Sequence, residues 1–67
     1  MTKEGIEIIV KNELLIRGKK EDLLELSDYI KEVATSENKS DHIHLDELTI
    51  ISSDSKIKEL IIEKEEN

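Results

Sequence analysis

The apolar positions of this chain repeat with two different periods, and the first is the period of a strand. Isoleucine and valine alternate with other residues over 6–11, and residues 13–17 repeat the alternation. Such alternation, with β-branched residues, is typical of strands. Asn12 separates the two segments, where a tight turn needs a residue that tolerates left-handed backbone geometry. The sequence therefore predicts a β-hairpin that ends at Gly18.

Residues 19–34 change to the spacing of a helix. Acidic residues at positions 21 and 22 suit the positive N-terminal end of a helix. The apolar residues follow the three- and four-residue intervals of an amphipathic helix, widened by Leu24. These residues are Leu23, Leu26, Ile30, Val33 and Ala34.

The second half of the chain predicts two further strands. Residues 35–41 have no large apolar side chain and indicate a solvated loop. Residues 42–46 alternate again, and residues 58–64 form the last predicted strand. The segment 47–57 is ambiguous: residues 52–55 have turn composition, and the apolar side chains before them are expected to be partly covered. Those side chains are Leu48, Ile50 and Ile51.

The element order β-β-α-β-β predicts a single small α+β domain over residues 1–67. The simplest arrangement is a four-stranded, mainly antiparallel sheet with one helix packed on one face. The sequence does not determine the strand order. The face under the helix is expected to consist of Ile6, Ile8, Val10, Leu14, Ile16, Ile43, Leu45, Leu60 and Ile62.

The far face of such a sheet would expose three large aliphatic side chains, Ile9, Leu15 and Ile61. A cluster of this kind suggests an interface, either with a second copy in a homodimer or with another protein. The alternatives are that residues 47–51 fold over this face, or that one strand is shifted by one residue.

Charge excludes several classes of function. The 67 residues contain 10 basic and 17 acidic side chains, for a net charge of −7. Such a surface repels phosphates, so we expect neither nucleic-acid nor membrane binding. No apolar run reaches the roughly 18 residues of a membrane span, and no signal-peptide core is visible, so we expect a cytoplasmic protein. Cysteine is absent, which excludes disulfides and thiolate chemistry.

The acidic excess lies mainly in the second half of the chain. Residues 34–67 contain nine acidic and four basic residues, against eight and six in residues 1–33. A concentrated negative patch accelerates association with a basic protein. A small acidic protein can block a nucleic-acid enzyme by occupying the surface that would otherwise take the phosphates.

Residues 41–46 form the densest polar motif. His42 and His44 would leave one face of a strand about 7 Å apart, with Asp46 as a third group. A metal site would need further carboxylates such as Glu7 or Glu63. The other interpretation is that the histidines form side-chain hydrogen bonds or contact a partner. We expect no metal or cofactor, and no catalytic residue, because a nucleophile motif is missing and the chain is too short for a sizeable cleft.

The chain also resembles the small bacterial immunity proteins of polymorphic toxin systems, in particular immunity protein family 32. The similar segments are residues 14–18, 23–26, 41–46, Ser55 and 59–63. The resemblance implies a non-catalytic cytosolic protein that binds and blocks a cognate toxin, often a nuclease.

Taken together, the sequence predicts a non-catalytic inhibitor that binds a basic toxin or enzyme. One alternative is a phage-type acidic inhibitor, or nucleic-acid mimic, that acts on a host or defence protein. Another is a small metal-binding module that uses the two histidines. The predicted partner-binding residues are Asp41, His42, His44, Asp46, Glu47 and Glu63.

Overall fold

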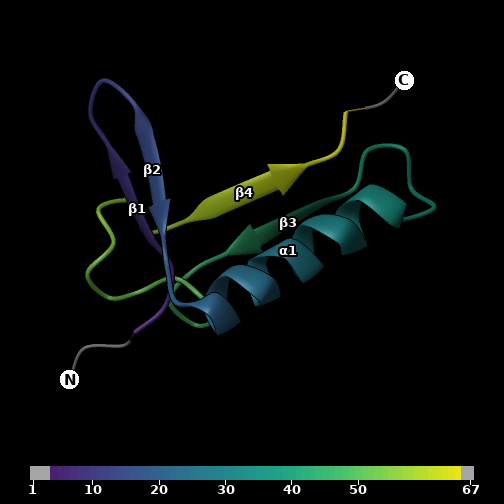
Figure 1. The fold of residues 1–67 in the computed structure, drawn as a ribbon. Coiled ribbons are helices and arrows are strands. Elements are labelled where there is room, and N and C mark those ends of the chain that lie inside the picture. The colour runs from purple at the N-terminus through teal and green to yellow at the C-terminus, as the bar shows by residue number, and fades with distance from the viewer. Residues whose placement is uncertain (1–3, 66–67) are drawn as a thin grey trace.

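The computed structural model describes residues 4–65 and contains one helix between two pairs of strands (Figure 1). The predicted order β-β-α-β-β is confirmed. Across the described residues, no helix has the length and apolar character that crossing a bilayer requires. The elements are β1 (Glu7–Val10), β2 (Leu14–Arg17), α1 (Lys20–Thr35), β3 (His42–Leu45) and β4 (Leu60–Glu63).

The first two strands form an antiparallel hairpin in which Ile8 lies opposite Ile16. The N–H of Lys11 donates to the carbonyl of Glu13 at 3.0 Å and closes the loop between them. No residue in the described part of the chain adopts the left-handed conformation, so the prediction of such geometry at Asn12 is wrong. A two-residue type I′ turn requires that conformation, whereas the longer loop here closes without it.

The last two strands form a second antiparallel hairpin with one apolar and one polar face. Leu45 lies opposite Leu60 on the face toward the helix, and His44 lies opposite Ile61 on the other face. The helix α1 runs along this hairpin (Figure 1). Leu45 is fully buried while His44 is exposed, so the alternation predicted in this region is confirmed.

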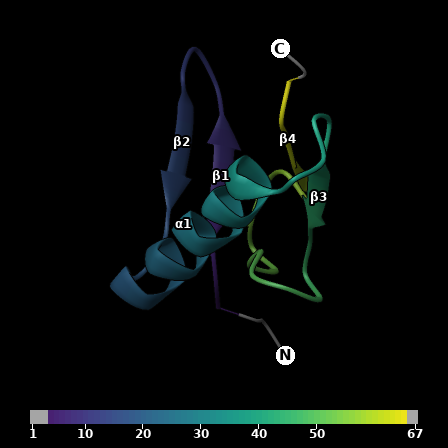
Figure 2. The same ribbon diagram turned by 90° about the vertical axis from the view of Figure 1, so that its right-hand side faces the viewer.

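The predicted four-stranded sheet is wrong, because the strands form two separate two-stranded sheets. Figure 2 shows the β1–β2 hairpin on one side of the molecule and the β3–β4 hairpin on the other. Ile61 therefore does not share a sheet face with Ile9 and Leu15, as a single sheet would have required. The α+β class itself is confirmed.

The sheets are separate because the segment that leads into β4 takes the hydrogen bonds of β1. The N–H of Ile6 donates to the carbonyl of Ile50 at 2.7 Å, and Ile6 forms a parallel bridge with Ile51. Further along, the carbonyl of Ile8 accepts the N–H groups of both Lys56 and Ile57, at 3.1 and 3.3 Å. The outer edge of β1 is thus occupied before β4 begins.

The core lies where the helix, the base of the first hairpin and the second hairpin meet. Its buried members come from four different parts of the chain, and four partly buried side chains pack against them. The buried members are Ile6, Ile8, Leu26, Leu45, Ile50 and Ile51, and the partly buried ones are Tyr29, Ile43, Leu60 and Ile62.

The expected contact between the helix and the whole of the first hairpin is wrong. Because α1 lies along β3 and β4, the hairpin side chains beyond Ile8 extend past the core. Val10 and Leu14 are 55% and 61% exposed. The apolar stripe of the helix is also less buried than predicted: Leu26 and Val33 are buried, whereas Leu23, Leu24 and Ile30 are exposed.

The ambiguous segment 47–57 contributes to the core at only part of its length. Ile50 and Ile51 are buried, but Leu48 is 93% exposed, so the expectation that it is covered is wrong. A Cβ at Gly5 would overlap the carbonyl oxygen of Ile50, so only glycine permits this close approach of the two backbones.

Candidate functional site

The outward face of the β3–β4 hairpin carries the predicted histidines. Strand alternation turns the neighbouring apolar side chains toward the core and leaves four others at the surface. Three of the six predicted partner-binding residues lie here together. We call this surface the histidine face, and it consists of His42, His44, Ile61 and Glu63.

The two histidine rings contact each other and extend to an acidic neighbour. Their centroids lie 5.1 Å apart in an edge-to-face arrangement, with 74° between the ring planes. Nδ1 of His44 lies 3.1 Å from Oε2 of Glu59, and both side chains are about half exposed. Exposed ion pairs of this kind add little stability. Because both histidine side chains are exposed, their rings are accessible to a partner.

Two of the carboxylates suggested as metal ligands, Asp46 and Glu7, make other contacts. Oδ1 of Asp46 accepts the N–H of Leu48 at 2.9 Å, and the Glu7 carboxylate lies 3.5 Å from the guanidinium of Arg17. In the part of the chain that the structure describes, no three histidine or carboxylate side chains are grouped as ligands for one ion. A metal site at His42 and His44 therefore has no support in the geometry.

Asp41 fixes the beginning of β3. Its carboxylate accepts the N–H of His42 at 2.9 Å, and its carbonyl accepts the N–H of Lys64 at 2.8 Å. A hydrogen bond from the Ser36 side chain, followed by that from the His42 N–H, holds the pKa of the Asp41 carboxyl below its ordinary value. Nζ of Lys64 in turn donates to the carbonyl of Ser36 at 2.6 Å. Asp41 thus joins the end of the helix to both strands.

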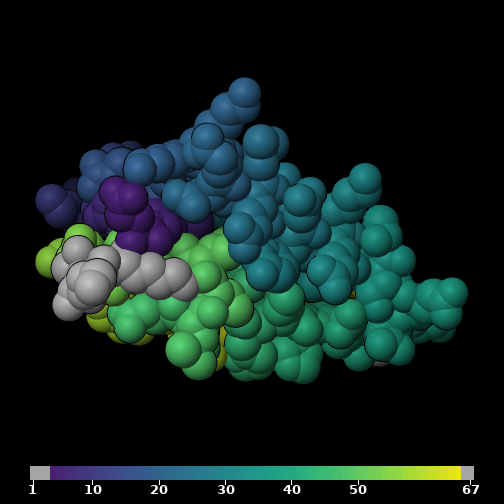
Figure 3. All heavy atoms as spheres, turned by 90° about the horizontal axis from the view of Figure 1, so that it is seen from below, coloured from purple at the N-terminus to yellow at the C-terminus, as the bar shows by residue number. Residues whose placement is uncertain are grey.

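Asp46 holds a turn at the other end of β3. Its carbonyl accepts the N–H groups of Thr49 and Ile51, and its own N–H donates to the Thr49 hydroxyl at 2.8 Å. Glu47 and Leu48 lie on this turn with exposed side chains. The space-filling view in Figure 3 shows the segment after β3, in green, as an open part of the surface beside the helix. The turn therefore presents an acidic and an apolar side chain on a hydrogen-bonded backbone.

The six predicted residues thus divide into one central group and two flanking positions. His42, His44 and Glu63 meet on the histidine face. Asp41 lies before β3, whereas Asp46 and Glu47 follow it. A strand of four residues spans about 13 Å, so the acidic residues lie at opposite ends of the face.

Sequence reasoning missed two exposed residues and one buried residue. Glu59 precedes β4, and only the strand register, which the sequence does not supply, places it beside His44. The exposure of Leu48 follows from the turn at Asp46. The sequence does not distinguish Glu59 or Leu48 from the other acidic and apolar residues near them, so it did not predict their positions at this surface.

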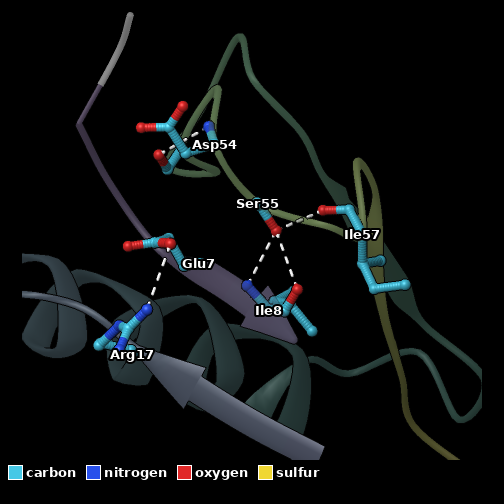
Figure 4. Close-up of polar contacts among 7 residues, drawn as sticks. Glu7, Ile8, Arg17, Asp54, Ser55 and Ile57 are labelled. Carbon is cyan, nitrogen blue, oxygen red and sulfur yellow. Dashed lines mark hydrogen bonds and ion pairs between the residues drawn. The ribbon is translucent and has the colours of Figure 1, made fainter. Parts of the chain in front are cut away.

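The buried residue is Ser55, which was predicted to be part of an ordinary turn. Its side chain is almost fully enclosed, with 1% exposure. Its hydroxyl accepts the N–H of Ile8 at 2.8 Å and donates to the carbonyl of Ile57 at 2.6 Å (Figure 4). The strands β1 and β4 do not pair. The N–H of Ile8, which would bond to a neighbouring strand in a larger sheet, bonds to the Ser55 side chain instead.

A charged hollow of about 330 Å³ lies at the base of the first hairpin. Ion pairs cross part of it, Arg17 with Glu7 at 3.5 Å and Lys19 with Glu4 at 3.1 Å. The hydrogen bond to Glu4 raises the pKa of Lys19 above its ordinary value. Figure 4 shows the ion pair between Glu7 and Arg17. None of the lining residues belongs to β3 or β4, so the hollow is separate from the histidine face.

Comparison with known families supplies the identity. The family model described as immunity protein 32 matches residues 13–65, which span β2, the helix and the whole β3–β4 hairpin. Neither a curated protein nor a solved structure matches the chain. Since the matched region covers most of the 67 residues, including the entire histidine face, the chain belongs to the immunity protein 32 family.

Proposed function

We propose that this immunity protein inhibits a basic bacterial toxin, such as a nuclease, by occupying the surface on which the toxin would bind its own substrate. Family membership supports the general role of toxin binding without catalysis. The observation that carries the specific proposal is the histidine face. It offers the half-exposed Ile61 within a ring of polar side chains.

The composition of this face is typical of a protein interface. Interfaces place apolar or aromatic anchors at the centre and polar groups at the rim. Here Ile61 lies opposite His44, and Glu63 lies opposite His42. The imidazole rings add flat surfaces that can stack on, or form hydrogen bonds with, side chains of a partner.

Charge directs the choice of partner. The histidine face contains Glu63 and is flanked by Glu59, Asp46 and Glu47, within a chain of net charge −7. A toxin that binds a phosphate backbone carries a basic surface, which this acidic rim complements. Complementary fields raise association rates and weaken the complex at high salt.

We further propose that the protein is a single domain and that it acts in the bacterial cytoplasm. Ile6, Leu26 and Leu45 come from the first strand, the helix and the third strand, and they share one core. This shared core supports one folding unit over residues 1–67. The cytoplasm is the compartment in which a nuclease toxin reaches nucleic acid.

Growth protection tests the proposal. Cells that express the toxin encoded beside this gene should survive when the chain is present, and the two proteins should elute as one complex on a sizing column. A variant with Glu47→Gln and Glu63→Gln should bind the toxin about tenfold or more weakly, because two rim charges are lost. The matched control, Glu21→Gln with Glu25→Gln, removes the same charge from the helix and should bind normally. Equal weakening in both variants would show that net charge, and not this face, determines binding.

A further inference from the structure

The strand β2 is an edge strand that no other described strand covers. It pairs with β1 on one side only, and Figure 2 shows it at an outer border of the molecule. Leu14, Leu15 and Ile16 are all exposed, at 61%, 44% and 38%. Soluble proteins normally protect such an edge with charge, proline or a covering segment, because an open apolar edge pairs with other chains.

The backbone groups on this free edge can be assigned from the hydrogen bonds of β1. The N–H of Ile8 donates to Ser55, and its carbonyl accepts from Lys56, so both groups point away from β2. In an antiparallel pair, the residue opposite also points its backbone groups outward. Ile16, which lies opposite Ile8, and by alternation Leu14 therefore direct their N–H and C=O groups to the open edge.

We propose that β2 pairs antiparallel with β2 of a second copy of this chain, across a twofold axis at Leu15. Leu14 of one copy then lies opposite Ile16 of the other, and each such pair exchanges two backbone hydrogen bonds. The two Leu15 side chains meet at the axis. The apolar side chains on both faces of the edge become cross-strand neighbours.

The charges of the strand match this register. With Leu15 at the axis, Glu13 lies opposite Arg17 of the second copy, and the same pair occurs twice. Within one copy, Glu13 and Arg17 are four residues apart along the strand, a separation of about 13 Å, so they do not contact each other. Glu13 and Arg17 can therefore pair only between copies, where Glu13 approaches an Arg17 that also lies 3.5 Å from Glu7 of its own copy.

The distribution of charge favours a second copy over a basic toxin as the occupant. Residues 7–17, which form the first hairpin, contain two acidic and two basic side chains, although the whole chain has a net charge of −7. Two acidic copies that pair here thus meet at a segment without net charge. A basic toxin would instead be drawn to the acidic hairpin β3–β4.

The resulting dimer should be reversible. An edge of about five residues buries less than the roughly 1,200 Å² of a standard stable interface. We therefore expect a monomer–dimer equilibrium that shifts toward monomer on dilution, and sedimentation of the wild-type chain from about 10 µM to about 1 mM should reveal it. A wild-type chain that remains monomeric at about 1 mM overturns the proposal.

Charge reversal tests the register. Glu13→Arg and Arg17→Glu should each weaken the dimer about tenfold, because each places like charges opposite one another at two sites. An equimolar mixture of the two variants should form a heterodimer, because both cross-strand pairs then become opposite in sign. Recovery in the mixture also shows that both variants are folded. A mixture that associates no better than its components overturns the pairing.

A single cysteine provides an independent test, since the chain contains none of its own. Two cysteines placed by Leu15→Cys would lie at a non-hydrogen-bonded pair, where the Cα atoms are about 4.5 Å apart and within disulfide range. Leu48→Cys is the matched control, because Leu48 is more exposed, at 93% against 44%. Under mild oxidation the Leu15→Cys variant should cross-link faster than the control. Equal or slower cross-linking contradicts the proposal, and neither result depends on toxin binding.

Discussion

Each of the two hairpins pairs two strands of four residues, but the hairpins have opposite relations to the core. In β3–β4, one face packs against the helix and the other is polar and acidic. In β1–β2, only Ile8 and the preceding Ile6 reach the core, and both faces beyond them expose aliphatic side chains. The difference arises because one helix of 16 residues lies along the second hairpin and leaves most of the first uncovered.

This contrast suggests a different role for each hairpin. The second hairpin is supported along its length, so its outward face can hold a fixed arrangement of side chains for a partner. The first hairpin is supported mainly at its base, through Ile6, Ile8 and the bond to Ser55. The open edge of β2 is a surface for association. The contact between the first hairpin and the core depends on these few residues.

The sharpest contrast is between the two isoleucines that lie opposite each other in the first hairpin. Ile8 is 2% exposed and Ile16 is 38% exposed. Ile8→Ala should lower the free energy of unfolding by about 2–5 kcal/mol, because it leaves a cavity in the core. Ile16→Ala should cost about 1 kcal/mol or less. Urea unfolding at low protein concentration measures both. Similar losses would mean that the first hairpin is packed along its whole length.

The next effect concerns the hydroxyl that joins this hairpin to the loop. Ser55→Ala leaves the N–H of Ile8 and the carbonyl of Ile57 without their buried partner, which should cost about 1–3 kcal/mol. Hydrogen exchange at the Ile8 amide should also become faster. The control is Ser27→Ala, because that hydroxyl bonds to a helix carbonyl at an exposed site and its loss should cost less than about 0.5 kcal/mol. An unchanged Ile8 exchange rate would show that the serine does not hold the strand.

The histidine face should affect binding and leave stability nearly unchanged. A variant with both His42→Ala and His44→Ala should unfold within about 0.5 kcal/mol of the wild type, since the rings are exposed and the contact with Glu59 is at the surface. Its affinity for the toxin, measured by calorimetry, should fall. A large loss of stability, or an unchanged affinity, would place these histidines in a structural role.

The smallest effect is a dependence on pH at Asp41. Because folding lowers the pKa of this carboxyl, its contribution to stability is present above the ordinary value of 3.8 and is lost as the pH falls through the folded value. The difference in unfolding free energy between the wild type and Asp41→Asn should therefore shrink on acidification from about pH 6 to about pH 2. A difference that does not vary with pH would show that the charge of the Asp41 carboxylate does not contribute to stability.

Much of the fold follows from hydrophobic periods, because these report which side of an element is covered. Alternation alone predicted which side chains share a face, as Ile8 does with Ile16 and Leu45 with Leu60. It did not predict that Val10, Leu14 and Ile16 lie outside the core. The break between the sheets was not predicted either. It depends on Ser55, which bonds to a residue 47 positions away, and nothing in a serine-rich turn indicates such a partner.

The candidate site was predictable to a similar degree. Strand alternation places His42 and His44 on one face, and that is a local property. The contribution of Ile61 and Glu59 depends on the register between β3 and β4, which forms across a long connection. Asp41 and Asp46 have sequence positions that suggest partner contacts, but their carboxylates hold the strand ends through hydrogen bonds that only the folded backbone creates.

The most direct test of the central claim compares two exposed aliphatic residues on opposite sides of the second hairpin. Ile61 on the histidine face is 50% exposed, and Leu24 on the helix is 55% exposed. Calorimetric titration of the toxin should show that Ile61→Asp binds at least about tenfold more weakly than the wild type, as expected for a central interface residue, whereas Leu24→Asp binds normally. Normal toxin binding by the Ile61→Asp variant would contradict the claim that the histidine face is the inhibitory surface.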